Sequence, residues 1–177
     1  MKKPTFFVSL LVFSLLTMGA YAQEVKSRPS PLAITAVRFK DAYLKITYSQ
    51  PQKRGREIFG KLVPFNEVWR TGANEATELL TTKNIQINGT LLKAGVYSLF
   101  TIPQKDKWTV IINSEVGLWG AYNYNQKLDV MRFDVPVMSS DVVYESFTME
   151  LNHRNDMADL LLYWDKTKIS IPIKFIN

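Results

Sequence analysis

The sequence contains no cysteine in 177 residues, and this absence excludes several kinds of chemistry. A chain without thiols forms no disulfide, no thiolate metal site and no cysteine nucleophile, and it offers no cysteine for lipid attachment. Packing and hydrogen bonds must therefore stabilise the fold, and we expect reductants to leave its melting unchanged.

Histidine is almost as scarce, because His153 is the single one. It lies in a polar stretch between two strand-like segments, where we expect a solvent-exposed turn residue. One histidine without cysteine falls short of the usual zinc ligand sets, and no G-x-S-x-G motif accompanies it as in many hydrolases. The sequence predicts no cofactor and no metal, although a site built from oxygen ligands alone stays open.

Long apolar runs are also lacking, except near the N-terminus. The dipeptide Lys2-Lys3 precedes an apolar stretch over residues 6–18, and Ala20-Tyr21-Ala22 follows it. The stretch is shorter than the roughly 20 apolar residues that a membrane-spanning helix needs. The order therefore predicts a signal peptide over residues 1–22, cleaved after Ala22. An uncleaved anchor is the alternative. We expect an exported protein, periplasmic or secreted, that is soluble and has no membrane span after cleavage.

Charge of one sign is not concentrated anywhere along the chain. The formal net charge is +6, and it falls by two when Lys2-Lys3 leaves with the signal peptide. Basic residues are interspersed with acidic ones instead of forming a stripe, so we expect no nucleic-acid partner. The remaining length suits a single domain, which we place at residues 34–177 after a lead-in over residues 23–33.

Apolar residues recur with a period of two from Ile34 onward, which is typical of β-strands. Strands are predicted at residues 34–40, 42–49, 77–82, 84–88, 95–102, 107–113, 128–135, 142–152, 158–165 and 167–176. Asn88-Gly89 predicts a tight hairpin turn between residues 85–87 and 90–92, since both central residues of such a turn need positive φ. The pattern predicts an all-β fold, an antiparallel β-sandwich of about 9–10 strands, with a barrel as the alternative.

Residues 51–76 break this rhythm, because they contain several glycines and prolines and show no clear alternation. A connection of this length is uncommon in a compact domain and is usually functional or disordered. Its many apolar side chains argue against disorder. We therefore predict one long ordered loop that packs on the sandwich and carries a short helix around Arg56 to Leu62.

Five motifs occur in order along the chain. They are KRGREIFG (residues 53–60), WRTGANEAT (69–77), AGVYSLFTIP (94–103), WTVIIN (108–113) and WGAYNY (119–124). With these motifs the sequence resembles domain-of-unknown-function family 2911, a family of exported bacterial proteins, from Pro31 to the C-terminus. The resemblance implies export and a β-rich fold, and it implies no substrate, cofactor or catalytic residue.

Three candidate ligand-binding residues lie in the RTGANEAT loop (residues 70–77), namely Arg70, Asn74 and Glu75. The guanidinium of Arg70 presents a planar fork to an anion or carbonyl, and Gly72 lets backbone amides approach a ligand closely. A structural interpretation stays open for each of two residues. In the first, Arg70 only anchors the loop through main-chain carbonyls. In the second, Glu75 pairs with Arg70 or caps backbone amides.

Three aromatic candidates lie in the WGAYNY segment (residues 119–124), namely Trp119, Tyr122 and Tyr124. Aromatic faces with nearby amides hold sugar rings and other flat ligands. The alternative is that these side chains fill the core and hydrogen-bond their polar tips at the surface.

Three hypotheses for the function follow from these residues. The leading one is an exported, non-catalytic binding module for a small polar ligand, glycan or envelope component, in which Arg70, Glu75 and Tyr122 face one shared site. A second is a hydrolase in which Glu75 works with another carboxylate about 5–10 Å away, as in glycosidases. The candidate partners of Glu75 are Glu67, Glu78 and Asp129. The third is a structural envelope or interaction protein without a small-molecule site.

Overall fold

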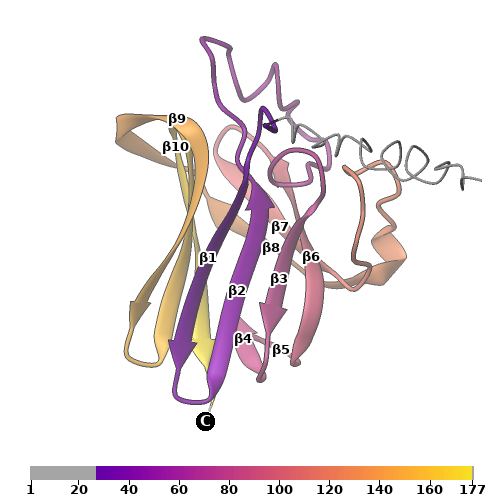
Figure 1. Cartoon of the computed structure of the whole chain (residues 1–177), viewed down its shortest axis with the longest axis vertical. Helices are drawn as coiled ribbons and strands as arrows, with labels where there is room; N and C mark the ends of the chain where they lie inside the picture. Colours follow the sequence, from indigo (N-terminus) through magenta and orange to yellow (C-terminus); the bar gives the residue numbers. More distant parts are fainter. Residues whose placement is uncertain (1–26, 177) are drawn as a thin grey trace, which may run out of the picture.

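Two antiparallel β-sheets pack face to face in a computed structural model that describes residues 27–176 (Figure 1). The strands of this part of the chain are β1 (Leu32–Phe39), β2 (Ala42–Ser49), β3 (Thr77–Thr81), β4 (Ile85–Ile87), β5 (Thr90–Leu92), β6 (Gly95–Pro103), β7 (Lys107–Asn113), β8 (Asp129–Pro136), β9 (Met138–Arg154) and β10 (Met157–Phe175). A single 3₁₀ turn, η1 (Gln126–Leu128), precedes β8. The predicted signal peptide and the first residues of the predicted lead-in lie outside the described residues.

The order of the strands confirms the predicted sandwich. One sheet has six strands in the order β1-β2-β3-β6-β7-β8, and the other has four in the order β5-β4-β10-β9. In Figure 1 the long β9–β10 hairpin lies across from the β1–β2–β3 side of the larger sheet. Each sheet keeps two open edges, so the fold is a sandwich of ten strands within the described residues and not a closed barrel.

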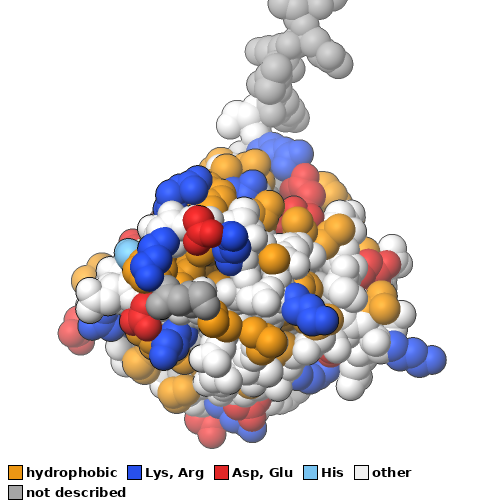
Figure 2. All heavy atoms as spheres, turned by 90° about the horizontal axis from the view of Figure 1, so that it is seen from below, with side chains coloured by type: hydrophobic (Ala, Val, Ile, Leu, Met, Phe, Trp, Pro, Cys, Tyr) orange, Lys and Arg blue, Asp and Glu red, His pale blue; other side chains and the backbone are white. Residues whose placement is uncertain are grey.

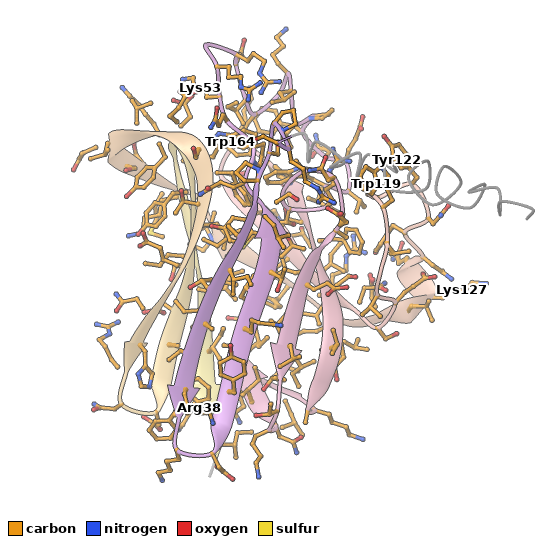
Figure 3. The ribbon with its side chains drawn as sticks, viewed as in Figure 1. Arg38, Lys53, Trp119, Tyr122, Lys127 and Trp164 are labelled. Atoms are coloured by element: carbon orange, nitrogen blue, oxygen red, sulfur yellow. The ribbon has the colours of Figure 1, made fainter. Side chains whose placement is uncertain are left out.

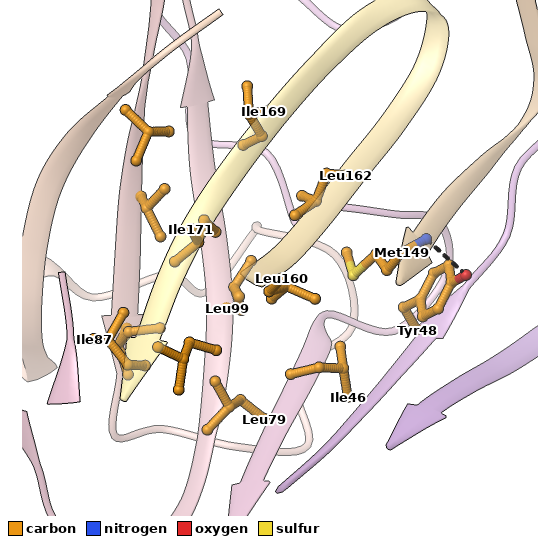
Figure 4. Packing of buried hydrophobic residues seen from close by; sticks show 14 of the residues in the cluster. Ile46, Tyr48, Leu79, Ile87, Leu99, Met149, Leu160, Leu162, Ile169 and Ile171 are labelled. Carbon is orange, nitrogen blue, oxygen red and sulfur yellow. Dashed lines mark hydrogen bonds between the residues drawn. The ribbon is translucent and has the colours of Figure 1, made fainter. Parts of the chain in front are cut away.

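The core lies between the sheets, where alternate side chains of both inner faces meet. Figure 4 shows Ile46 and Leu79 of the larger sheet facing Leu160 of β10, and all three side chains are almost fully buried. The backbone N–H of Met149 donates to the hydroxyl of Tyr48 at 2.9 Å, so one polar bond also joins the two layers. The period-two pattern of the sequence thus produces one buried face per strand.

The hairpin at Asn88-Gly89 is confirmed, because the two residues have φ of 49° and 77° and join β4 to β5. The predicted boundary between strands at residues 158–165 and 167–176 is wrong, since both belong to β10. The polar residues near Asp165 do not end the strand. Asp165 adopts a left-handed φ of 53° at a shift in register against β9, so the strand bends there and continues.

The long loop is ordered as predicted, but the short helix expected around Arg56 to Leu62 is wrong. Turns replace it, and the backbone N–H of Gly60 donates to the carbonyl of Val63 at 2.8 Å. Gly60 has a φ of +88°, a conformation that ends any helix started before it. Ile58 and Val63 are both buried, so the reversed chain places two anchors in the core.

The loop covers one end of the sandwich and is attached to both sheets (Figure 1). Lys53 forms an ion pair of 2.6 Å with Asp165 of β10, and its backbone N–H donates to the carbonyl of Glu145 in β9. At the other side, Trp69 and Thr101 of β6 exchange backbone hydrogen bonds. These attachments hold the loop in a fixed position over the core.

The opposite end of the sandwich carries charges of both signs among apolar side chains (Figure 2). Lys83 pairs there with Asp41 at 2.7 Å, and Lys174 lies 3.9 Å from Asp156. Within residues 27–176 no helix has the length and apolar character of a membrane span. A cleft of about 290 Å³ lies at this end beside Asp41 and Lys83, and a larger one of about 540 Å³, described next, lies at the loop end.

Candidate functional site

Five aromatic side chains pack under the long loop and form what we call the aromatic floor. They are Phe59, Trp69, Trp108, Phe147 and Trp164, and Trp69 contacts each of the other four. The ring centroids of these four contacts lie 5.1 to 6.2 Å apart. The indole N–H of Trp69 donates to the carbonyl of Gly72 at 3.0 Å, which ties the floor to the RTGANEAT loop.

A cleft of about 540 Å³ opens above this floor, and we call it the loop cleft. Trp69 and Trp164 line its base, while Leu62, Pro64 and Val68 supply apolar surface on one wall. The other side is formed by residues of the RTGANEAT loop and by Ala121 and Tyr122 of the WGAYNY segment. Figure 3 shows Trp164 at the loop end of the sandwich, with Tyr122 and Trp119 further out on the neighbouring segment.

The two segments predicted to form a site lie side by side. The backbone N–H of Ala76 donates to the carbonyl of Leu118, and the N–H of Gly120 donates to the carbonyl of Asn74, both at 2.9 Å. Glu75 and Trp119 form an isolated antiparallel bridge between these bonds. The backbone therefore fixes the WGAYNY segment against the RTGANEAT loop along one wall of the loop cleft.

Arg70 is the polar side chain of the loop cleft that stands out, because its Nε atom is buried and has no hydrogen-bond partner among the described residues. Its guanidinium lies against Gly120, where an added Cβ would be 3.1 Å from Nη1 of Arg70 and 2.8 Å from Cε2 of Tyr122. Gly120 also has a φ of +70°. A side chain at this position would overlap the Tyr122 ring and crowd Nη1 of Arg70, so the glycine leaves room for both groups beside it.

Glu75 faces the N-terminal lead-in. Its two carboxylate oxygens accept hydrogen bonds from Nη1 of Arg28 at 2.8 and 3.0 Å, and Ser49 Oγ lies 3.4 Å from Oε2. Its own backbone N–H, then Arg28 and Ser49, hydrogen-bond the ionised carboxyl and lower the pKa of Glu75, although partial burial opposes them. The alternative that Glu75 pairs with Arg70 is therefore wrong, because its partner is Arg28.

Asn74 belongs to the same attachment of the lead-in. Its Nδ2 donates to the carbonyl of Ser30 at 3.3 Å and lies 3.4 Å from Ser49 Oγ. Arg54 donates to the carbonyl of Pro29 at 3.0 Å from the long loop. Asn74 and Glu75 thus hold the chain before β1 in place, and neither side chain lines the loop cleft.

The structure brings together Arg70 and Tyr122, but it places Glu75 in a smaller neighbouring cleft of about 220 Å³, which Glu78 also lines. Glu67 lines the loop cleft instead. Asp129 is further away in the fold and accepts a 2.6 Å hydrogen bond from the hydroxyl of Tyr124. Of the three carboxylates considered as partners of Glu75, only Glu78 therefore lines the same cleft.

The aromatic candidates also separate. Tyr122 is 82% exposed and lines the loop cleft, whereas Trp119, 58% exposed, does not line it. Tyr124 packs edge-on against Phe100, and burial, followed by the hydrogen bond and charge of Asp129, raises its pKa to about 12. Tyr124 thus matches the structural interpretation of its motif, with a packed ring and a bonded hydroxyl.

Two residues of the cleft base were missed by the sequence reasoning. Trp69 directly precedes the RTGANEAT loop, so its place next to that motif was a usable signal. Trp164 lies in the middle of β10, where a core aromatic residue looks the same in sequence as any other. Only the packing of the loop over the bend of β10 near Asp165 brings Trp164 into the site.

Metal ligands are not gathered in the described part of the chain, where no three histidine or acidic side chains lie close enough to hold an ion. His153 packs edge-on against the rings of Phe39 and Phe175, each at 5.8 Å between centroids. It lies close to the turn between β9 and β10, at the end of the sandwich away from the long loop.

Comparison with known proteins identifies the family. The model of a family described as a protein of unknown function, DUF2911, matches residues 30–173. No curated protein and no solved structure matches the chain. The chain belongs to the DUF2911 family, as its five motifs indicated.

Proposed function

We propose that this member of the DUF2911 family is an exported, non-catalytic module that binds a small polar ligand or glycan in the loop cleft. The observation that carries the proposal is the cleft itself, whose volume of about 540 Å³ lies within the range of ligand sites in proteins. It opens where two sequence motifs are paired, over a base of packed aromatic rings.

The walls of the loop cleft have the composition of a binding site. Trp69 and Trp164 at its base are held by ring contacts and by hydrogen bonds from their indole N–H groups to backbone carbonyls. A ligand would meet apolar surface that needs no rearrangement, which lowers the entropic cost of binding. Arg70, Glu67 and the exposed Tyr122 add a few polar groups that give orientation.

The alternative of a hydrolase based on Glu75 has less support. A general acid needs a raised pKa near the working pH, whereas the pKa of Glu75 is lowered and the ionised group is bonded to Arg28. Ser49 lies against the same carboxylate. These contacts favour a scaffold role for Glu75, and the binding role rests on Arg70 and Tyr122.

A titration followed by two-dimensional amide NMR tests the binding proposal. Glucose, galactose, N-acetylglucosamine and their disaccharides are added to the protein, and saturable shifts are expected at the amides of Ala73, Ala121 and Tyr122. Tyr122→Ala should weaken binding about tenfold, because it removes an aromatic wall of the cleft. Trp119→Ala is the matched control, since it removes an exposed aromatic side chain just outside the cleft.

Shifts that map to another surface, or equal losses in both variants, would contradict the loop cleft as the binding site.

Export is tested separately. If residues 1–22 are a signal peptide, the protein purified from the extracytoplasmic fraction begins at Gln23, and N-terminal sequencing gives the result. A chain that retains residues 1–22 would contradict the proposed cleavage.

A further inference from the structure

Arginine side chains of this protein are almost all engaged by other groups. In the described residues, Arg28 pairs with Glu75, Arg132 with Asp129 and Arg154 with Asp159. Arg54 and Arg56 donate to main-chain carbonyls, and Arg38 lies over the ring of Tyr43. Arg70 is the exception within residues 27–176, since its buried Nε has no partner and no ion pair joins its guanidinium.

A buried Nε without a partner is costly, because this donor has lost water and gained no hydrogen bond in exchange, although the rest of the Arg70 side chain is only half-buried. No carboxylate of the described residues forms an ion pair with Arg70 to offset this cost. Glu75, five residues away, is turned to Arg28, and Gly120 keeps the space beside Nη1 open. The arrangement leaves a fork of N–H donors in a cleft that is open to a ligand.

The groups around Arg70 restrict the kind of anion that fits. Arg56 lines the same cleft, but its Nε and Nη2 donate to the carbonyls of Lys53 and Gln52. Glu67 also lines the cleft and repels negative charge. Because Arg56 keeps its positive charge, two guanidinium groups and one carboxylate give the cleft lining a small positive excess, which suits a monoanion better than a phosphate monoester. A planar carboxylate also matches the fork of Arg70 in two parallel hydrogen bonds.

The rest of the cleft suits the body of a ring-shaped ligand. The ring of Tyr122 and the guanidinium of Arg70 both lie against Gly120, and Leu62, Pro64 and Val68 add apolar surface to the same cleft. A flat ring attached to the carboxylate would therefore find apolar and aromatic contacts while its charge stays on Arg70. Both sugar acids and aromatic acids have this chemistry.

We propose that the loop cleft takes a carboxylate-bearing ring compound, whose carboxylate is bound by the guanidinium of Arg70 and whose ring lies against Tyr122 and the apolar wall. This inference rests on the proposed function, because it names the ligand class of the same cleft. Arg70 is the residue that determines specificity for the charge, and Tyr122 is the one that contacts the ring.

The test uses two matched pairs of probes, glucuronate with glucose and benzoate with benzyl alcohol. Each is titrated into the protein while the Nε–H resonance of Arg70 and the amides of the cleft are followed by NMR. At least one carboxylate should shift the Nε–H resonance saturably and bind about tenfold or more tightly than its neutral partner, as expected for a charge-assisted pair. A carboxylate preference in the glucuronate pair would indicate a sugar acid as the ligand, and one in the benzoate pair would indicate an aromatic acid.

Two variants and a control separate the charge from the rest of the cleft. Arg70→Gln should abolish the preference for the carboxylate, and Arg70→Lys should keep only part of it, because lysine lacks the planar fork. Arg56→Gln, in the same cleft, should reduce the preference much less than Arg70→Gln, because Nε and Nη2 of Arg56 are bonded to carbonyls. Melting temperatures recorded alongside should not fall for Arg70→Gln, since a buried donor without a partner is removed.

The outcomes distinguish this inference from the proposed function. Neutral probes that bind in the cleft as tightly as their carboxylates, or an unchanged preference in Arg70→Gln, would overturn the ligand class and leave the binding function standing. If none of the four probes shifts a cleft resonance, the ligand class is overturned. The binding function then falls only if the neutral sugars of its own titration also leave the cleft unchanged.

Discussion

The two halves of the RTGANEAT loop differ in how their polar side chains are satisfied. In the second half, Asn74 and Glu75 bind Ser30, Arg28 and Ser49, so they are occupied with holding the lead-in. In the first half, Arg70 faces the loop cleft with a buried donor that has no partner in the described structure. Because buried polar groups are normally hydrogen-bonded, Arg70 stands apart from Asn74, Glu75 and the bonded Thr71, and the proposed binding site is therefore based on it.

The WGAYNY segment is divided in the same way. Tyr124 packs against Phe100 and donates its hydroxyl proton to Asp129, whereas Tyr122 is 82% exposed at the mouth of the cleft. Two tyrosines of one motif, two residues apart, thus have different surroundings. Residue type and motif alone do not decide the role, and the contacts of each side chain do.

The largest effect is expected for Trp69→Ala, which removes the centre of the aromatic floor. Trp69 is 9% exposed and contacts four other rings, so the free energy of unfolding should fall by about 3–5 kcal/mol. Urea unfolding followed by circular dichroism measures the loss. Trp119→Ala is the control and should change the unfolding free energy by less than about 0.5 kcal/mol, because its side chain is exposed. Equal losses would contradict the distinction between floor and surface.

The next effect concerns Tyr124. Tyr124→Phe removes a hydrogen bond to an ionised carboxylate and should lower the unfolding free energy by about 1.5 kcal/mol. Asp129 keeps Arg132 at 3.0 Å and Asn113 at 2.9 Å, which limits the loss. Tyr122→Phe, the matched control, should leave stability unchanged. The contrast between the two motif tyrosines fails if both substitutions destabilise alike.

Tyr124 also makes stability depend on pH in the alkaline range. Its pKa is raised from 10.0 to about 12, so the folded state favours the neutral phenol. The stabilisation is therefore complete below pH 10.0 and is lost as the pH rises through about 12. Burial also raises the pKa of Tyr48, so an ultraviolet titration should show more than one late-titrating tyrosine, and Tyr124→Phe should remove one of them. An unchanged late step in this variant would contradict its assignment to Tyr124.

Much of the fold could be predicted from the sequence because strands leave a local signal. The period-two pattern of β2 and the Asn88-Gly89 turn depend on neighbouring residues only, and both are confirmed. The short helix was wrong because the left-handed φ of Gly60 and the burial of Ile58 and Val63 are set by packing against the core. Local propensity does not contain that information.

The candidate site could be predicted only in part for the same reason. The sequence indicated the RTGANEAT and WGAYNY motifs as the candidate site, and in the structure their backbones form a bridge. The directions of Arg70 and Glu75 could not be predicted, because Thr71 and Asn74 have left-handed φ of 54° and 57° and turn the chain between them. The partner of Glu75, Arg28, lies 47 residues away along the chain, outside any local pattern.

The smallest effect is expected for Glu75→Gln, which weakens the attachment of the lead-in. The side chains of Arg28 and Glu75 are 52% and 41% exposed, so water screens the pair and its loss should cost no more than about 1 kcal/mol. A double-mutant cycle with Arg28→Gln, measured by urea unfolding, isolates the coupling between the two side chains.

The pH dependence of this pair has the opposite sign to that of Tyr124. The pKa of Glu75 is lowered from 4.5, first by its own backbone N–H and then by Arg28 and Ser49, so the ionised carboxylate stabilises the fold above pH 4.5 and the contribution is lost as the pH falls through the lowered value. Glu75→Gln should flatten the acid limb of the stability curve slightly and leave binding in the loop cleft unchanged, because Glu75 does not line it. If Glu75→Gln weakened binding as much as Tyr122→Ala, Glu75 would also contribute to the ligand site, and the contrast drawn between Arg70 and Glu75 would be wrong.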